Sequence, residues 1–418
     1  MHTVTQLCLM SYGRFLKGRA EAKRRLVAMM PRQTGKTPSM EQRLRLMGKF
    51  MYALDETNIR IITLMHRIGP RNLLEIARAA GLPPTSVYDR ARKLEERFMA
   101  LSAANLDHSK LGLRKCITLV ESNPGMEDFV TEAVAVPNYW RAITRCEGGF
   151  THYALHAVPE GQAREFERYV AETARQGLVR KYELVWVTDY YYAFPNFRLY
   201  DPASGTWSFE WDRWSEWVRE KKDPKAICDP QRYSNEADKM DLLILTQLEL
   251  NARAKFSNIS KLLGITLQAV KHRYDKRILP RGLIRDFVIN VLPYPPELSD
   301  LYEVLLAFED EEGMNAFFGL SGKMFPIQRT VKVLGEKKLS VRTYSPRSET
   351  ERLFSMLSGL ARSGVISDYS AVRIRPETQT WQTVSAELFE DKIGWKYELT
   401  QHLAALDVIV EHAKVNVR

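Results

Sequence analysis

Two groups of polar and basic residues have the types and the spacing needed to contact DNA. Within each group the residues recur at helical intervals, so they would project from one outward side of a helix. Hydroxyl, amide and imidazole groups can hydrogen-bond to base edges, and lysine or arginine can neutralise phosphates. The first group is Thr85, Ser86, Tyr88, Arg90, Arg92 and Lys93, and the second is Gln268, Lys271, His272, Arg273, Lys276 and Arg277. A solvated helix surface is the alternative interpretation of such a pattern.

Both groups lie in a stretch that occurs twice, because residues 55–97 align with residues 238–280 without a gap. Each copy predicts three helices, and Gly81 or Gly264 provides the turn between the last two. Two short helices joined in this way form a helix-turn-helix, whose second helix can enter a major groove. Duplication of the whole unit favours DNA contact over an incidental solvated surface. The identical positions are Asp55/Asp238, Ile61/Ile244, Thr63/Thr246, Ile76/Ile259, Gly81/Gly264, Val87/Val270, Arg90/Arg273 and Lys93/Lys276.

Three other patterns could carry chemistry, and the sequence favours none of them. Residues 34–37 resemble a phosphate-binding loop, but that motif needs glycine where Met30 stands. His152 and His156 share a strand side with Cys146 on the expected neighbour, but they lack the further partners of a metal site. No serine, histidine and aspartate arrangement can be derived from their order alone. We therefore expect no metal, no cofactor and no catalytic residue, and we predict that the protein is not an enzyme.

The net charge of +10 is concentrated near the start of the 418-residue chain. Residues 1–50 hold eleven Lys and Arg but two acidic residues, which predicts a basic arm attracted to DNA phosphates. The alternatives are that translation starts at Met40, Met47 or Met51, or that the arm is a transit peptide. The four cysteines show no metal-site spacing, and no apolar run could span a bilayer. These features predict a cytoplasmic, nucleoid-associated protein without membrane contact.

Each helical unit is followed by alternating strands and helices. After the first copy, the pattern predicts strands at 115–120, 142–146, 151–158 and 184–188, with helices at 126–136 and 162–176. The order βαββαβ is that of a ferredoxin-like unit, and residues 304–374 repeat it. Between the copies, Trp207, Trp211 and Trp214 form one stripe of an expected connecting helix, which we expect to dock against the sheets. Stacking of these rings on bases is the alternative.

Together these residues resemble the Lrp/AsnC family of transcription regulators. The resemblance implies winged helix-turn-helix domains, ferredoxin-like sensing (RAM) domains and double-stranded DNA as the partner. It also implies a small-molecule effector site at the turn between the middle strands, at Gly149 and His152 in one copy and at Gly335 and Lys338 in the other. His152 stands about where the family carries Asp, which argues against the usual amino-acid effector. The residues that carry the resemblance are Leu54-Asp55, Ile61-Ile62, Ile76-Ala77, Gly81-Leu82, Val87, Arg90, Leu94-Glu95, Leu106-Asp107 and Leu111-Gly112, and they make it stronger over 51–190 than over 235–375.

The expected fold is therefore α+β, with two winged helix-turn-helix domains alternating with two ferredoxin-like (βαββαβ) domains in an intramolecular pseudo-dimer. The leading prediction is a sequence-specific DNA-binding transcription regulator that reads an asymmetric site, with further self-association left open. Sirohaem decarboxylases reuse the same two-domain fold. The alternatives are therefore a fused enzyme of that kind, with Arg145, His152 and His156 as residues to watch, or a non-catalytic oligomerisation scaffold. The expected domains are 1–50 (basic arm), 51–112, 113–190, 191–234 (Trp-rich connector), 235–297, 298–375 and 376–418 (helical extension).

Overall fold

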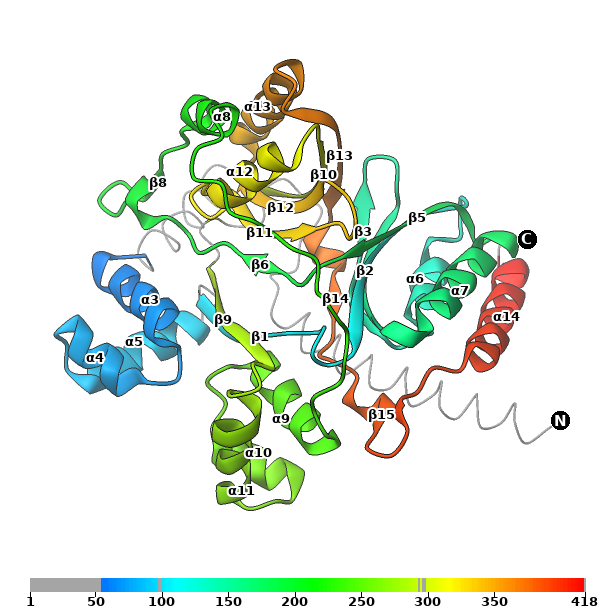
Figure 1. The fold of residues 1–418 in the computed structure, drawn as a ribbon, viewed down its shortest axis with the longest axis horizontal. Helices are drawn as coiled ribbons and strands as arrows, with labels where there is room; N and C mark the ends of the chain where they lie inside the picture. Colours follow the sequence, from blue (N-terminus) through cyan, green and yellow to red (C-terminus); the bar gives the residue numbers. More distant parts are fainter. Residues whose placement is uncertain (1–53, 97–99, 292–293, 295–297, 417–418) are drawn as a thin grey trace.

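The fold is a mixed α+β arrangement in which two helical heads lie on one side of two β-sheets (Figure 1). The computed structural model describes residues 54–96, 100–291, 294 and 298–416. The predicted basic arm, 1–50, lies outside the described residues. The mixed α+β class expected from the sequence is confirmed.

Each head consists of three helices and a strand. Asp55 and Asp238 cap the first helices by accepting hydrogen bonds from the backbone N–H groups of Asn58 and Asp241. Gly81 and Gly264 end the second helices in the left-handed region, at φ of +63° and +67°. Head 1 contains α3 (Glu56–Ile68), α4 (Leu73–Ala80), α5 (Pro84–Glu96) and β1 (Ala100–Leu106). Head 2 contains α9 (Lys239–Leu250), α10 (Phe256–Leu263), α11 (Leu267–Arg273), a π-helical turn (Tyr274–Ile278) and β9 (Ile284–Val291).

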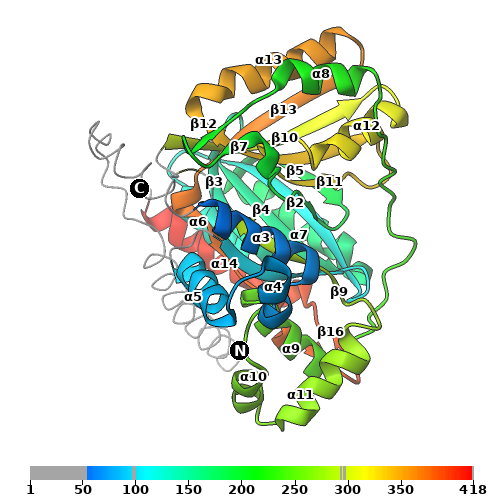
Figure 2. The same cartoon turned by 90° about the vertical axis from the view of Figure 1, so that its left-hand side faces the viewer.

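The strands that follow the helices pair with each other across the two heads. β1 and β9 form a two-stranded antiparallel sheet, in which Ala100 lies opposite Val291 and Ala104 opposite Phe287. The strand of each head, which takes the place of the wing in a winged helix-turn-helix, thus pairs with the strand of the other head. Figure 2 shows β9 emerging beside α3 of head 1, and the two elements are in contact.

Each head is followed by a four-stranded antiparallel sheet that carries two helices. Sheet 1 has the order β5-β2-β4-β3, and sheet 2 has the order β13-β10-β12-β11. In both, the chain order of elements is βαββαβ. The bounds in sheet 1 are β2 (Leu113–Ser122), α6 (Glu127–Ala135), β3 (Trp140–Glu147), β4 (His152–Pro159), α7 (Ala163–Arg175) and β5 (Val179–Val187). In sheet 2 they are β10 (Ser299–Phe308), α12 (Glu311–Ser321), β11 (Ile327–Lys332), β12 (Lys338–Pro346), α13 (Thr350–Arg362) and β13 (Ile366–Ile374).

The two sheets are joined at both edges by short seams. At one edge β3 pairs with β13 through Cys146 opposite Ile374 and Glu147 opposite Arg373. At the other edge an isolated bridge joins Val187 to Val333. Side chains between the sheets are therefore enclosed on both flanks, while α6 and α7 cover the outside of sheet 1, and α12 and α13 cover the outside of sheet 2 (Figure 1).

The segment after each sheet crosses to the other one. β6 (Tyr191–Tyr192), which follows sheet 1, pairs with β11 of sheet 2, and β14 (Thr380–Trp381), which follows sheet 2, pairs with β3 of sheet 1. The next helices continue the exchange, because α8 (Trp211–Arg219) packs on α12 and α13, whereas α14 (Leu399–Asn416) packs on α6 and α7 (Figures 1 and 2). Each half of the chain therefore covers the other.

The Trp-rich connector is the start of this crossing. It contains the hairpin β7 (Tyr200–Asp201) and β8 (Thr206–Trp207), and the ring of Trp207 stacks on Phe325 at 3.6 Å between centroids. The expected helical stripe of three tryptophans is wrong for Trp207, which lies in β8, because the helix α8 begins only at Trp211. Trp211 and Trp214 lie on that helix and are buried, as expected for a packing stripe. A similar hairpin, β15 (Phe389–Glu390) and β16 (Gly394–Trp395), precedes α14.

Candidate functional site

The predicted DNA-contact residues divide into an exposed set and a set held within the heads. In α5, Thr85, Tyr88, Arg92 and Lys93 are exposed and Ser86 is half-buried, and in the third helix of head 2 the side chains of Gln268, Lys271, His272 and Lys276 are exposed. Arg90, Arg273 and Arg277 are instead only partly exposed and form ion pairs with carboxylates of their own heads. The structure therefore assigns these three arginines a structural role, and DNA contact by the exposed residues remains a prediction.

The same clamp occurs in both heads. Arg90 donates to the Oδ2 of Asp55 at 2.8 Å and to the side chain of Asn58 at 3.0 Å. Arg273, which aligns with Arg90, donates to Asp238 at 2.8 Å and to Asp241 at 2.7 Å. The clamp ties the third helix to the N-terminus of the first.

The two heads also contact each other directly. The guanidinium group of Arg71 donates to the carbonyl oxygens of Ala252 and Ala254 and lies 4.1 Å from the ring centroid of Phe256. Arg253 returns an ion pair to Glu95 at 2.9 Å. These contacts, together with the shared β1–β9 ribbon, hold the heads as one unit.

The predicted effector residues lie against different neighbours. Gly148 precedes Gly149 in the β3–β4 turn, and a Cβ atom at Gly148 would stand 2.8 Å from the carbonyl oxygen of Ala371, so the turn presses on β13. Gly335 donates its backbone N–H to Asp229 at 2.8 Å, and Lys338 pairs with Glu336. An effector role for Gly149, His152, Gly335 and Lys338 stays a prediction.

The two strand histidines face α6 and not the space between the sheets. His152 hydrogen-bonds to the hydroxyls of Thr131 and Thr151, and His156 to the hydroxyl of Thr118 and the carbonyl oxygen of Val134. Burial lowers the pKa of both imidazoles to about 4, so they are neutral at pH 7. They are satisfied core histidines, as favoured over metal ligands from the sequence.

The space between the sheets contains a buried acid–base group centred on Asp189. One oxygen of Asp189 accepts from Lys115 Nζ and from His108 Nδ1, both at 2.9 Å, and the other accepts from the backbone N–H of His108 at 2.8 Å. Burial raises the pKa of Asp189, but Lys115 and His108 outweigh it and hold that pKa well below the ordinary value. Burial and the nearby Lys115 lower the pKa of His108, and its Nε2 has no hydrogen-bond partner among the described residues.

A second buried group is centred on Glu303. Its Oε1 accepts from Ser340 at 2.6 Å, and its Oε2 accepts from Arg342 at 2.7 Å and from Arg329 at 3.4 Å. Arg329 also donates to the hydroxyl of Tyr153 at 3.2 Å across the two sheets. Burial opposes ionisation of Glu303, but the two arginines prevail and lower its pKa. Glu303 is therefore ionised at pH 7.

The ring of Tyr190 joins the two groups. Lys115 Nζ lies 4.1 Å from its centroid and the guanidinium carbon of Arg329 lies 3.9 Å from it. We define the inter-sheet cluster by its members: His108, Lys115, Tyr153, Asp189, Tyr190, Glu303, Arg329, Ser340 and Arg342. It holds three cations (Lys115, Arg329, Arg342) against two carboxylates, so one buried positive charge is in excess when His108 is neutral.

Sequence reasoning missed this cluster. Part of the signal was present, because Lys115 and Glu303 are charged residues at inward positions of strands that are rich in apolar residues. Arg329 and Arg342 lie in more polar strands and do not stand out in the same way. Charged side chains at such positions are rare unless they have partners. Their partners lie on other strands, and the pairing of the two sheets could not be read from one segment.

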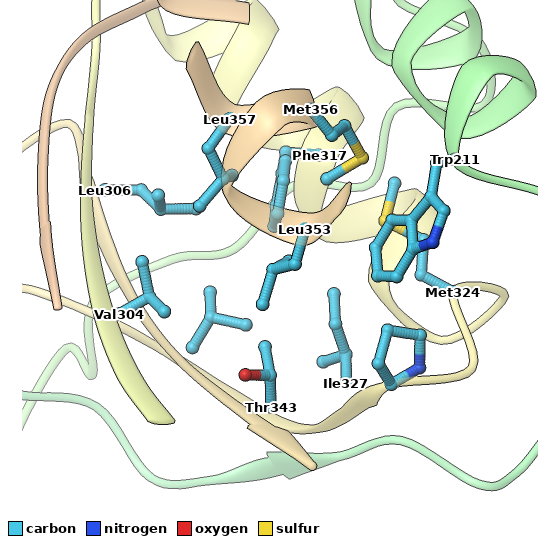
Figure 3. Close-up of a pocket in the computed structure, with 12 residues that line it drawn as sticks. Trp211, Val304, Leu306, Phe317, Met324, Ile327, Thr343, Leu353, Met356 and Leu357 are labelled. Carbon is cyan, nitrogen blue, oxygen red and sulfur yellow. The ribbon is translucent and has the colours of Figure 1, made fainter. Parts of the chain in front are cut away.

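A pocket behind sheet 2 is a gap in the core. Its cavity volume of about 10 Å³ is room for roughly one water molecule. Trp211, Val304, Phe317, Leu353 and Met356 are among its lining side chains, and Figure 3 shows them converging from α8, α12, α13 and the sheet. An apolar gap of this size does not hold a ligand.

Comparison with known proteins places the fold. No protein-family model and no curated protein matches the sequence. The siroheme decarboxylase NirDL has a similar crystal structure, with a TM-score of 0.52, 11% identity, and a match that covers 85% of this chain and 98% of NirDL. Its complex with an iron-uroporphyrin III analogue matches with a TM-score of 0.52 and 10% identity, over 85% of this chain and 99% of that one. An AsnC family transcriptional regulator from Agrobacterium tumefaciens matches 32% of this chain and 89% of its own, with 16% identity and a TM-score of 0.26.

The likeness to NirDL contradicts the prediction that the chain is not an enzyme. That prediction rested on the helix-turn-helix heads. A whole enzyme aligns with 85% of this chain, so such an architecture does not by itself mark a regulator. At this level of identity the likeness concerns the fold alone. Among the described residues, no helix is long and apolar enough to cross a membrane.

Proposed function

We propose that the protein is an enzyme that removes CO₂ from a carboxylate-bearing substrate, with the inter-sheet cluster as its reaction centre. The observation that carries the proposal is the match of the complete NirDL frame to 85% of this chain. Siroheme is the first substrate to test, because NirDL is a siroheme decarboxylase. We also propose that the two halves are a tandem duplication forming a pseudo-dimer, which the clamps Arg90–Asp55 and Arg273–Asp238 support.

The charges of the cluster favour a carboxylate guest. The excess positive charge among Lys115, Arg329 and Arg342 would be balanced by one carboxylate, and buried charges are costly unless they are paired. The Nε of Arg329 and the Nη2 of Arg342 lack hydrogen-bond partners within the described part of the chain. Both are donors that a carboxylate oxygen could occupy.

The proposed reaction breaks the bond between the carboxylate carbon and its neighbour. The electron pair stays on the remaining carbon, CO₂ leaves, and one proton must be supplied to that carbon. Tyr153 is the proposed donor, because its hydroxyl already accepts from Arg329 at 3.2 Å and can release its own proton. Arg329 would then stabilise the resulting phenolate. Burial raises the pKa of Tyr153, so the hydroxyl is protonated before reaction.

Substrate must reach a cluster whose charged side chains are buried. The seams are the proposed entry, since β3 and β13 share two residue pairs and β5 and β11 share a single bridge. Parting one seam would expose the cluster and leave each sheet intact.

The test is anaerobic addition of siroheme to the full chain, with Soret absorbance reporting binding and mass spectrometry of the pigment reporting loss of CO₂. Arg342→Gln should weaken binding, and Tyr153→Phe should bind but release CO₂ more slowly. Arg219→Gln, at an exposed position of α8, is the matched control. A wild-type protein that neither shifts the Soret band nor changes the pigment mass would exclude siroheme as the substrate and remove the support for this function.

A second candidate function, DNA binding, is favoured by the exposed face of α11 and the turn after it. Lys271 and Lys276 are exposed there and have no ion-pair partner among the residues that the structure describes. His272 and Gln268 lie on the same exposed surface and can hydrogen-bond to bases. Gel shifts with genomic fragments at increasing salt test this candidate, and a complete lack of retardation at low salt would exclude it.

A further inference from the structure

We infer that the two heads are unequal, with head 2 gripping duplex DNA while Asp89 and Glu96 prevent head 1 from doing so. The inference rests on the DNA-binding candidate function and specifies which surface carries it. Residues 55–96 hold seven Lys and Arg against six acidic residues, a formal charge of +1. The aligned residues 238–279 hold eight against four, a formal charge of +4.

The third helix of head 1 neutralises its own cation. Arg92 is exposed and donates to Asp89 at 2.9 Å and to Glu96 at 3.1 Å, three and four residues away on the same surface. The paired carboxylates would face the phosphates that Arg92 should attract. Lys93 is left as the exposed cation of α5 without an ion-pair partner in the described chain.

The third helix of head 2 lacks these carboxylates at the aligned positions. Asp89 aligns with His272 and Glu96 with Leu279, and Tyr88 aligns with Lys271. Asp275, which aligns with Arg92, is an exposed carboxylate on this surface, but no ion pair joins it to Lys271 or Lys276 among the described residues. Lys271 and Lys276 therefore project to solvent as cations without an ion-pair partner in that part of the chain. Arg273 and Arg277 hold Asp238 and Asp241 and so keep those two carboxylates occupied within the head.

The contacts between the heads preserve this inequality. Arg71 of head 1 is anchored on Ala252, Ala254 and Phe256 of head 2, so the heads approach a duplex as one unit. A duplex that docks on head 2 is therefore presented to a neutral third helix on head 1. We expect head 2 to contact one half-site of the DNA, and we expect no second half-site that contributes equally to the affinity.

The experiment compares salt dependence of DNA binding for charge variants of the full chain. Lys271→Ala/Lys276→Ala should lower the slope of log K against log salt by about 1.8, since each lost phosphate contact removes about 0.9. Asp89→Asn/Glu96→Gln should do the opposite, raising affinity and steepening the slope by about 0.9, because Arg92 is released. Arg362→Ala/Lys414→Ala removes the same charge from exposed positions on α13 and α14, away from the heads, and should leave the slope unchanged.

The outcomes are distinguishable. If the head 2 variant and the Arg362/Lys414 control lower the salt slope equally, the inference is overturned and DNA binding is left in place. An Asp89/Glu96 variant with unaltered affinity also overturns it, because the carboxylates then restrain nothing. Wild-type protein that fails to bind at low salt excludes the DNA-binding function itself. Unchanged thermal unfolding confirms that each variant is folded, which is expected for substitutions of exposed side chains.

Discussion

Replacing Glu303 with glutamine removes the carboxylate that Arg329 and Arg342 share between the two sheets. The side chains of Glu303 and Arg342 are each 6% exposed, and that of Arg329 is 10% exposed. The amide of glutamine keeps one acceptor oxygen in place of two, it carries no charge, and its NH₂ group would face a guanidinium or the Ser340 hydroxyl. Two buried cations would remain beside Tyr153 and Tyr190 without an anion.

The magnitude follows from breaking a buried ion pair. Removal of one partner costs about 3–5 kcal/mol, because an uncompensated charge is left in the interior. For a body of two sheets and their helices, this corresponds to a fall in Tm of roughly 6–20 °C. The double variant Glu303→Gln/Arg342→Gln should recover part of the loss, because it removes one of the two stranded cations.

Thermal unfolding followed by intrinsic tryptophan fluorescence, to which the buried Trp211 and Trp214 contribute, measures this effect. Glu336→Gln is the matched control, since Glu336 pairs with Lys338 at an exposed turn and should cost less than about 1 kcal/mol. If Glu303→Gln and Glu336→Gln lowered Tm equally, the cluster would not stabilise the docking of the sheets.

The acid dependence provides an independent check with a defined sign. The arginines hold the pKa of Glu303 below its ordinary value of 4.5, so the folded state favours the ionised form more than the unfolded state does. Its contribution to stability is present above pH 4.5 and is lost as pH falls through the lower folded-state pKa. Glu303→Gln should therefore flatten the stability profile below pH 4.5.

Three further predictions concern the histidines, the clamps and the contact between the heads. The pKa of His156 is lowered from 6.5 to about 4 in the folded state, so between these pH values the unfolded chain binds the proton first. As pH falls from 6.5 toward 4, the free energy of unfolding should decrease by up to about 1.4 kcal/mol per pH unit. Calorimetry of His156→Gln should show a smaller decrease over the same pH range. The double variant Arg273→Ala/Arg277→Ala should lower Tm more than Arg90→Ala, because both arginines pair with the fully buried Asp241 while the Asp55 side chain is 46% exposed; equal shifts would contradict this ranking. Arg71→Ala should speed hydrogen exchange at residues 252–256, whereas the exposed Arg78→Ala should not.

The helices of the heads could be predicted because their signals are local. Asp55 and Asp238 cap the first helices, and Gly81 and Gly264 terminate the second. Thr266 caps the third helix of head 2, where its hydroxyl accepts from the backbone N–H of Ala269 at 3.1 Å. Each signal lies within a few residues of the boundary that it sets. Both residues of the clamp were also among the identical positions of the repeat, since Asp55 aligns with Asp238 and Arg90 with Arg273. The sequence did not show that the two residues of each pair are in contact.

The direction of the arginines could not be predicted from helical spacing. A long side chain on the flank of a helix can reach outward to solvent or back to a neighbouring helix, and periodicity does not separate these cases. Arg273 and Arg277 reach back because Asp238 and Asp241 lie behind them, and Arg277 lies within the π-helical turn Tyr274–Ile278 that directly follows Arg273. That partner set depends on how α9 crosses α11.

The inter-sheet cluster depends on even longer separations. Arg329 and Tyr153 are 176 positions apart, and Asp189 lies 81 positions after His108. Strand alternation predicts which side chains point inward, but it does not say which sheet they will meet. The pairing of β1 with β9 and the crossing of β6 and β14 were missed for the same reason.

The two candidate functions meet at β1, which joins the heads to the inter-sheet cluster. Asn105 at the end of β1 donates to the carbonyl oxygen of Tyr190 at 3.2 Å, and the backbone of His108 donates to Asp189 at 2.8 Å. A carboxylate guest that moves Tyr190 or Asp189 would therefore act on the strand that sets the position of both heads. Binding free energies are reciprocal, so DNA would then change the affinity for that guest by the same factor. A chain that only decarboxylates requires no such coupling. Titration of the guest with and without DNA therefore tests it: a changed affinity indicates two coupled functions, and an unchanged affinity indicates that the two sites are independent.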